Sequence, residues 1–309
     1  MKIVFMGTPD FAVPSLEMLV QNNYTISVVV TAPDKPRGRG QQVSYTPVKE
    51  FAIQNSIPVL QPDSLNDPQF ISDLTAIHAD LFIIVAFKIL PKEVYTLPSN
   101  GSFNLHASLL PKFRGAAPIN WAIINGEKES GVTTFFLQEK VDTGNIIMQH
   151  RIPISDEMNA GELHDALSVL GASAVIETVR MIESGSAAPQ QQNDSSASPA
   201  PKLFKGNTRI NWNQPSEKIH NFIRGLSPYP AAWTQHNQKA IKIFKSCLEQ
   251  SPQQLTVPSG AIIADEKKLF VTTIDGNLEI LELQQEGKKR LSAEEFLRGY
   301  TFSQADRFE

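Results

Sequence analysis

Residues 2–30 read KIVFMGTPDFAVPSLEMLVQNNYTISVVV and contain two apolar runs with one amphipathic stretch between them. The first run, residues 2–6, ends at a Gly-Thr-Pro turn. Asp10 can cap the helix that the apolar spacing over residues 11–20 predicts. The second run, residues 26–30, is rich in valine and predicts another buried strand. Strand, helix and strand in this order form a βαβ unit, so we predict an α/β fold with a mainly parallel, doubly wound sheet.

The same patterns continue along the chain. They predict further strands at about 57–60, 81–86, 102–106, 132–137 and 146–149. They predict helices at about 46–54, 68–77, 91–96, 118–125 and 160–183. Residues 185–207 are rich in small, polar and proline residues, a composition typical of a linker. Beyond it, a short helix at about 215–225 precedes short strands that predict a small β-barrel, near 231–235, 240–246, 260–264, 268–272 and 278–283.

Length and composition fit a globular protein of one or two domains. The 309 residues, 41% hydrophobic and 19% charged, can bury a core and exclude disorder over most of the chain. A net charge of −4 excludes a generally basic nucleic-acid coat, although not a local basic patch. The longest apolar runs, such as residues 81–87, are too short to span a bilayer, and Lys2 is followed at once by a strand-like run rather than a signal peptide. We therefore expect a soluble, intracellular protein.

Cysteine and histidine usage argues against disulfides and metal sites. Cys247 is the only cysteine, which excludes an internal disulfide and a Cys-rich zinc site and fits a reducing cytoplasm. The six histidines are scattered, and none has the spacing of a metal-binding pair. We expect no metal cofactor.

The turn after the first strand is a weak candidate for a nucleotide site. A dinucleotide fold would carry Gly-x-Gly-x-x-Gly there, and only Gly7 is present. NAD binding is therefore disfavoured, and a tight strand-to-helix turn is the simpler interpretation.

A stronger candidate is the stretch 102–111, where a predicted strand runs into a loop. Strand side chains alternate faces, so Asn104 and His106 project from the same side. Both lie at the carboxyl end of a predicted parallel strand, where open α/β sheets bind their ligands. An amide can donate to an oxyanion, and an imidazole is a base near neutral pH. A structural role, with His106 as a buried and hydrogen-bonded core histidine, remains the alternative.

Asp142, in the sequence Asp-Thr-Gly, is a third candidate. The same tripeptide occurs in aspartic proteases, which need two such carboxylates, whereas this chain has one copy in an α/β context. A lone aspartate in a turn is usually a turn former. The functional hypothesis is that Asp142 orients His106.

Basic residues occur in two further places. The loop 33–42 carries Lys35, Arg37 and Arg39 on a Pro/Gly backbone, and it is either a solvated surface or an arm that meets nucleic-acid phosphates. In the second domain Lys242 and Lys245 lie on one predicted strand. That domain is close to neutral overall, so any nucleic-acid surface there depends on how these side chains are arranged.

Taken together, these segments resemble the methionyl-tRNA formyltransferases, a family within the 10-formyltetrahydrofolate-dependent formyltransferases. The resemblance covers essentially the whole chain. It rests on Gly7-Thr8-Pro9-Asp10-Phe11-Ala12, the loop Pro33 to Gly40, Asn104-x-His106-x-Ser108-Leu109-Leu110-Pro111, Arg114-Gly115-Ala116-Ala117-Pro118-Ile119, Asp142-Thr143-Gly144, Ala200-Pro201-Lys202-Leu203, Ile210-Asn211-Trp212 and Ile223 to Thr234.

The resemblance implies a function and a set of site residues. It implies a Rossmann-like catalytic domain over 1–184, a linker over 185–207 and an OB-like, tRNA-binding barrel over 208–309. The co-substrate would be 10-formyltetrahydrofolate, the acceptor initiator methionyl-tRNA, and the protein a cytoplasmic monomer. The implied residues are Asn104, His106 and Asp142 for catalysis, Ser108, Leu109, Leu110 and Pro111 for folate, and Lys35, Arg37, Arg39, Lys242 and Lys245 for tRNA.

Two rival functions remain open at this point. A related formyltransferase could act on an amino sugar nucleotide or on glycinamide ribonucleotide, but we would then expect no loop like that of Arg39. A catalytically inert RNA-binding protein is the rival of another class. The presence of Asn104, His106 and Asp142 together argues against it.

Overall fold

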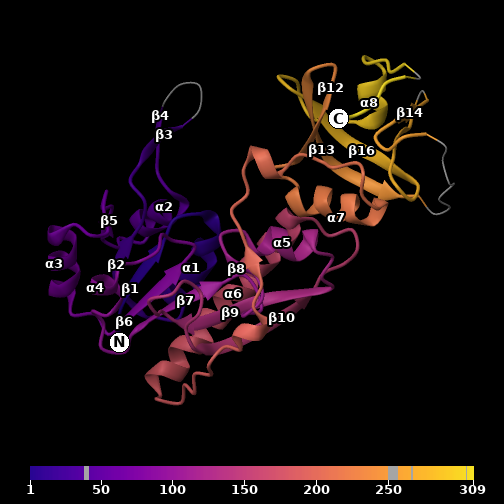
Figure 1. The fold of residues 1–309 in the computed structure, drawn as a ribbon. Coiled ribbons are helices and arrows are strands. Elements are labelled where there is room, and N and C mark those ends of the chain that lie inside the picture. Colours follow the sequence, from indigo (N-terminus) through magenta and orange to yellow (C-terminus); the bar gives the residue numbers. More distant parts are fainter. Residues whose placement is uncertain (38–41, 250–256, 266, 304) are drawn as a thin grey trace. The chain divides into compact units, whose positions relative to one another are not determined.

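The computed structural model describes residues 1–37, 42–249, 257–265, 267–303 and 305–309, which form two compact units (Figure 1). The N-terminal unit comprises Met1–Gly115, Ser130–Ile152 and His164–Pro199. The C-terminal unit comprises Ala116–Glu129, Pro153–Leu163 and Ala200–Glu309. Two segments that precede residue 200, 116–129 and 153–163, are thus built into the C-terminal unit.

The N-terminal unit contains a sheet with the strand order β10-β9-β7-β6-β1-β2-β5. Its strands are β1 (Lys2–Gly7), β2 (Thr25–Val30), β5 (Val59–Leu60), β6 (Leu81–Val85), β7 (Ser102–His106), β9 (Glu129–Phe136) and β10 (Ile146–Pro153). The pairs β1–β2, β1–β6, β2–β5 and β6–β7 are parallel, and β7–β9 is antiparallel. The predicted α/β class with a mainly parallel sheet is confirmed.

Both faces of this sheet are covered, which explains the continuous apolar runs of its central strands. In β1, residues Ile3, Val4, Phe5 and Met6 are all fully buried, although successive side chains point to opposite faces. The helices of the unit are α1 (Val13–Gln21), α2 (Pro47–Gln54), α3 (Pro68–Ile77), α4 (Lys92–Tyr95) and most of α6 (Ala160–Glu183), with the 3-10 helices η1 (Asp10–Ala12) and η2 (Asp194–Ser196). Residues 160–163, the start of α6, belong to the C-terminal unit.

The predicted element boundaries agree with the structure for α3, α6 and β7. The strand expected at 57–60 is shorter, since only Val59 and Leu60 pair with β2. Pro58 has no N–H to donate to the ladder, and its carbonyl accepts from Val29 N. No helix among the described residues is both long enough and apolar enough to cross a bilayer.

The C-terminal unit is built on an antiparallel sheet with the order β12-β13-β16-β15-β14, in which β17 pairs with β16. Its strands are β12 (Ala232–His236), β13 (Lys239–Leu248), β14 (Ile262–Ala264), β15 (Leu269–Thr272), β16 (Asn277–Gln285) and β17 (Leu291–Ser292). Its helices are α5 (Pro118–Ile124), η3 (Lys205–Asn207), α7 (Ser216–Leu226) and α8 (Ala293–Leu297). This sheet is consistent with the OB-like domain that the resemblance implied.

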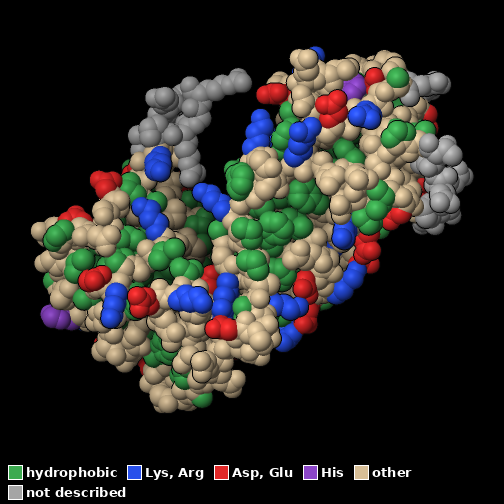
Figure 2. All heavy atoms as spheres, in the orientation of Figure 1, with side chains coloured by type: hydrophobic (Ala, Val, Ile, Leu, Met, Phe, Trp, Pro, Cys, Tyr) green, Lys and Arg blue, Asp and Glu red, His purple; other side chains and the backbone are tan. Residues whose placement is uncertain are grey.

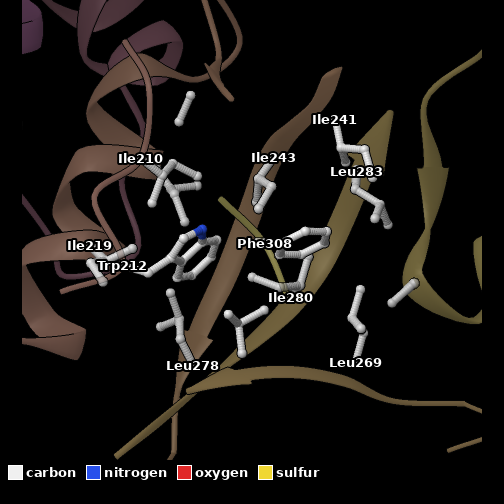
Figure 3. Packing of buried hydrophobic residues seen from close by; sticks show 14 of the residues in the cluster. Ile210, Trp212, Ile219, Ile241, Ile243, Leu269, Leu278, Ile280, Leu283 and Phe308 are labelled. Carbon is white, nitrogen blue, oxygen red and sulfur yellow. The ribbon is translucent and has the colours of Figure 1, made fainter. Parts of the chain in front are cut away.

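The core of the C-terminal unit lies between this sheet and α7 (Figure 3). Trp212 stacks on Phe308 with their ring centroids 5.8 Å apart, and Ile210 and Ile219 pack beside them. The sheet contributes alternating residues of its strands, Ile241, Ile243, Leu269, Leu278, Ile280 and Leu283, all fully buried. One apolar face of each strand therefore holds this unit together.

In Figure 2, basic and acidic side chains are interspersed over the displayed surface.

A buried arginine ties residues 153–163 to α7 within the C-terminal unit. Arg224 is 5% exposed, and its guanidinium donates to the carbonyls of Ser155 (3.2 Å) and Met158 (2.8 Å) and to the side chain of Asn221 (2.8 Å). These bonds give carbonyls of an irregular segment a buried partner.

We expect the stability of this unit to fall in mild acid because of His220. Burial holds the pKa of His220 below its ordinary value of 6.5, and Nδ1 lies 3.0 Å from Ser246 Oγ. The folded state therefore favours the neutral ring. Its contribution is fully present above the unfolded-state pKa and is lost as the pH falls through the folded-state pKa. Thermal unfolding followed between about pH 8 and pH 5 should show a steeper loss for the wild type than for His220→Gln; parallel curves would contradict this.

Candidate active site

The sheet order places a ligand-binding edge at the carboxyl ends of β1, β6 and β7. The chain leaves β1 toward β2 on one side and returns to β6 on the other, which makes a topological switch point. Gly7 ends β1 in close contact with its neighbours: a Cβ there would lie 2.8 Å from the Ala12 Cβ and 3.0 Å from the Val85 carbonyl oxygen. This close approach explains the glycine without any nucleotide site.

His106 ends β7 and is 6% exposed. Its Nε2 lies 2.9 Å from the carbonyl oxygen of Phe113. A carbonyl only accepts, so Nε2 carries the proton of the neutral ring and Nδ1 carries the lone pair. Nδ1 lies 3.9 Å from Asp142 Oδ2. The basic nitrogen therefore faces the carboxylate.

Asp142 is held in place by its turn and by a backbone donor. Its side chain is 12% exposed, and Oδ2 accepts from Gly115 N at 2.9 Å. Its φ of 55° is a left-handed conformation that aspartate tolerates better than most residues. A Cβ at Gly144 would lie 1.6 Å from the Phe136 carbonyl oxygen, so the turn requires a glycine there. The Asp-Thr-Gly sequence is thus a turn that presents one carboxylate.

Asn104 lies two residues before His106 on β7, as the alternation predicts, and is half-buried. Its side-chain amide makes no hydrogen bond to any of the described residues. The amide is therefore available to a ligand, unlike the imidazole Nε2 of His106.

The predicted folate segment, residues 108–111, forms a tightly bonded loop. Ser108 is fully buried and its hydroxyl donates to the Lys112 carbonyl at 2.7 Å. Thr133 Oγ1 donates to the Ser108 carbonyl at 2.6 Å and accepts from Leu110 N at 3.1 Å. Leu110 is 3% exposed, whereas Leu109 and Pro111 are half-buried. An apolar edge at Leu109 and Pro111, not the Ser108 hydroxyl, is what this loop can offer a ligand.

Sequence reasoning missed Gln192, which braces the Asp142 turn. Its side chain is 7% exposed and donates to the carbonyls of Asp142 (2.9 Å) and Gly144 (2.8 Å). Its amide oxygen accepts from Arg114 Nη2 at 2.7 Å and Nε at 3.2 Å. Arg114 Nη2 also donates to Asp194 Oδ1 at 2.7 Å, which holds the pKa of this carboxyl below its ordinary value. Gln192 and Asp194 lie in the stretch whose composition indicated a linker.

We expect Gln192→Ala to lower turnover about tenfold, because the two carbonyls and Arg114 lose their buried partner and the Asp142 turn loosens. The pH profile of kcat should shift with it, which a loss of folded protein alone would not cause. Gln191→Ala, an exposed neighbour, is the matched control. An unchanged kcat and pH profile in Gln192→Ala would remove Gln192 as a positioning residue.

The predicted tRNA contacts are distributed over both units. Lys35 and Arg37 belong to β3 (Lys35–Arg37), which pairs antiparallel with β4 (Gln42–Ser44). Lys35 is exposed, and Arg39 lies outside the described residues. Lys242 and Lys245 are exposed on β13 of the C-terminal unit. No group of three His, Cys, Asp or Glu side chains within the described ranges is placed to hold a metal ion.

Comparison with known proteins identifies the family. The formyl transferase model matches residues 1–179, and the model of the formyl transferase C-terminal domain matches residues 202–301. A methionyl-tRNA formyltransferase of Bacteroides thetaiotaomicron is 48% identical over 98% of this chain and 97% of its own. A methionyl-tRNA formyltransferase of Chlorobium chlorochromatii is 49% identical over 97% of this chain and 96% of its own.

Solved structures give the same fold. The sugar 3N-formyl transferase WlaRD, solved in the presence of dTDP and 5-N-formyl-THF, superposes with a TM-score of 0.68 at 27% identity over 94% of this chain and 99% of its own. An N-formyltransferase from Helicobacter canadensis superposes with a TM-score of 0.66 at 24% identity, over 94% of this chain and 100% of its own. With a family model over more than half of its length and relatives that align along almost all of it, this chain belongs to the formyltransferase family.

Proposed function

We propose that this chain transfers the formyl group of 10-formyltetrahydrofolate to the α-amino group of methionyl initiator tRNA, for translation initiation. The observation that carries the chemical part is the pairing of His106 Nδ1 with Asp142 Oδ2 at 3.9 Å, at the ligand-binding edge of the sheet. The identity of 48% to relatives named methionyl-tRNA formyltransferase, against 27% to the sugar enzyme, supports the tRNA acceptor.

In this proposal His106 is the general base. The separation of 3.9 Å is too long for a direct hydrogen bond, but it allows one amine nitrogen or water to lie within about 3 Å of both atoms. Nδ1 takes the proton that the amine loses as it bonds to the formyl carbon. The imidazolium so formed attracts the Asp142 carboxylate by about 4 kcal/mol at an effective dielectric constant of about 20. Asp142 thus favours proton transfer without accepting the proton itself.

Asn104 would stabilise the negative charge that develops on the formyl oxygen. Its amide lies on the same side of β7 as His106 and has no partner among the described residues. Loss of such a donor costs about 3–4 kcal/mol in well-studied acyl-transfer enzymes.

Folate is the co-substrate in this proposal and supplies the formyl carbon that the amine attacks. The bond between this carbon and folate N10 then breaks, N10 takes up the proton that His106 holds, and tetrahydrofolate leaves. Leu109 and Pro111 offer it a half-buried apolar edge beside the catalytic strand end. Lys35, Arg37, Arg39, Lys242 and Lys245 would contact the tRNA. The proposal also takes the protein to be a cytoplasmic monomer that uses no metal cofactor.

The test is an acceptor comparison with purified protein and 10-formyltetrahydrofolate. We expect formylation of charged initiator tRNA, and little of charged elongator tRNA, free methionine, an amino sugar nucleotide or glycinamide ribonucleotide. Faster formylation of either small nucleotide substrate would overturn the proposed acceptor. No formyl transfer to any acceptor would favour the inert RNA-binding rival.

A further inference from the structure

The C-terminal unit contains a pocket of about 480 Å³ on the outer face of its sheet. Three lining residues lie directly opposite one another on neighbouring strands: Trp233 on β12, Lys242 on β13 and Gln284 on β16. The residues on either side of Lys242, Ile241 and Ile243, point into the core and are fully buried. The pocket therefore lies on the solvent side of the sheet, and its volume suits a small ligand.

Exposed aromatic rings flank this pocket. Tyr229, which follows α7, is 82% exposed, and Phe204, which precedes η3, is 60% exposed. Both rings contribute to the lining, and neither belongs to the core of the unit. Large aromatic side chains gathered around a pocket are typical of surfaces that stack on flat ligands.

The charge around the pocket favours an anion. Lys205 Nζ and the Arg209 guanidinium each lie 5.5 Å from the centroid of the Trp233 ring, and Lys242 lines the floor. Within the described ranges neither Lys205 nor Lys242 forms an ion pair, whereas Arg209 Nε donates to the main-chain oxygen of Glu309 at 3.4 Å. Glu286 is the acidic residue of the lining. In Figure 2 basic and hydrophobic side chains lie side by side on the displayed face of this unit.

We propose that this pocket binds one unpaired nucleotide of the tRNA, with its base against Tyr229 and Phe204 and its phosphate near Lys205 and Lys242. The inference rests on the proposed function, which supplies the RNA. A stacked, paired base has no free face, so the ring contacts select an unpaired one. Gln284 Nε2 donates to the Lys288 carbonyl at 2.7 Å, which leaves its amide oxygen to accept from a base N–H. Stacking admits every base, so the rings alone specify no sequence.

The test measures binding of uncharged initiator tRNA to the full-length protein by fluorescence anisotropy, without folate. Tyr229→Ala should raise Kd about tenfold, whereas Tyr229→Phe, which keeps the ring, should stay within about twofold. Lys242→Ala should raise Kd several-fold. It should also lower the slope of log Kd against log salt concentration by about one, since about one fewer counterion is released on binding. The control is Lys268→Ala, which removes an exposed lysine that pairs with Glu279 elsewhere on the sheet. Ultraviolet cross-linking of wild-type complexes should attach Tyr229 or Phe204 to a nucleotide that is unpaired in the tRNA.

Equal Kd values for Tyr229→Ala and wild type, or an equal loss in Lys268→Ala, would overturn the pocket assignment. Binding of an acidic peptide in the pocket with no effect of these variants on tRNA would also overturn it. The readout needs no formyl transfer, so it is independent of the catalytic proposal. A wild type that binds tRNA through Tyr229 but formylates nothing would refute the activity and keep the pocket.

Discussion

Replacement of His106 by alanine is expected to lower kcat for formyl transfer by about 10³-fold, within the 10²–10⁴ range of general-base contributions. The ring that faces Asp142 at 3.9 Å would be gone, and the attacking amine would have no nearby base. The fold should survive, because within the described residues the His106 ring makes one hydrogen bond, to the Phe113 carbonyl, besides its 3.9 Å approach to Asp142. Single-turnover kinetics with saturating folate and charged tRNA, together with a thermal unfolding curve, would measure both effects.

Asp142→Asn provides the matched test of the pair. Residues that act as one unit lose activity non-additively, so His106→Ala/Asp142→Asn should be little worse than the worse single variant. His78→Asn, at an exposed histidine whose φ of 49° asparagine tolerates, should leave kcat unchanged. Fully additive losses would mean that Asp142 acts independently of His106. Near-normal turnover in His106→Ala would remove the proposed base.

Arg39→Lys is expected to lower kcat/KM for methionyl-tRNA at least tenfold. A guanidinium makes paired hydrogen bonds to phosphate or to a base edge, and an ammonium keeps the charge but loses this geometry. The paired strands β3 and β4 lie on either side of residues 38–41. The chain just before β3 is fixed by Asp34, which forms an ion pair with Lys49. Asp34 and Lys49 each also hydrogen-bond to the side chain of Gln61. Formylation rates over a range of tRNA concentrations would measure the effect.

Arg37→Lys is the control for the loop, and its effect should be smaller because its charge alone would serve. Both variants should keep the steps that need folate alone. The rate at which each variant slowly hydrolyses 10-formyltetrahydrofolate in the absence of tRNA would measure these steps. Wild-type kinetics in Arg39→Lys would leave the loop as a solvated surface and strengthen the amino-sugar or ribonucleotide alternative.

The sequence predicts the sheet and its helices well because their signal is local. The continuous apolar run of β1 and the helical apolar spacing of α3 and α6 each lie within a few neighbouring residues, so the sequence shows them directly. The strand end at Asn104 and His106 could be predicted for the same reason, since alternation and a parallel sheet fix where the two side chains point. The helix α8 was missed, although Ser292 and Glu295 form a capping box that sequence alone could have indicated.

What the sequence could not supply depends on polar contacts between distant segments. Gln192 reaches the carbonyls of Asp142 and Gly144 across about fifty residues, and a linker-like composition carries no trace of it. The bonds from Arg224 to the carbonyls of Ser155 and Met158 likewise bring residues 153–163 into the C-terminal unit. The hydrophobic pattern of the sequence does not indicate such bonds. Their acceptors are backbone carbonyls, which every residue carries, so the sequence does not show which carbonyl a polar side chain will reach.

The most direct test of the central claim follows a labelled formyl group. Protein is mixed with 10-formyltetrahydrofolate carrying a ¹³C-formyl carbon and with methionyl initiator tRNA, and the amino acid released from the tRNA is analysed by mass spectrometry. The account predicts ¹³C-formylmethionine from the wild type and about 10³-fold slower formation by His106→Ala at equal tRNA occupancy. Unlabelled methionine from the wild type, or label transferred equally fast by His106→Ala, would contradict it.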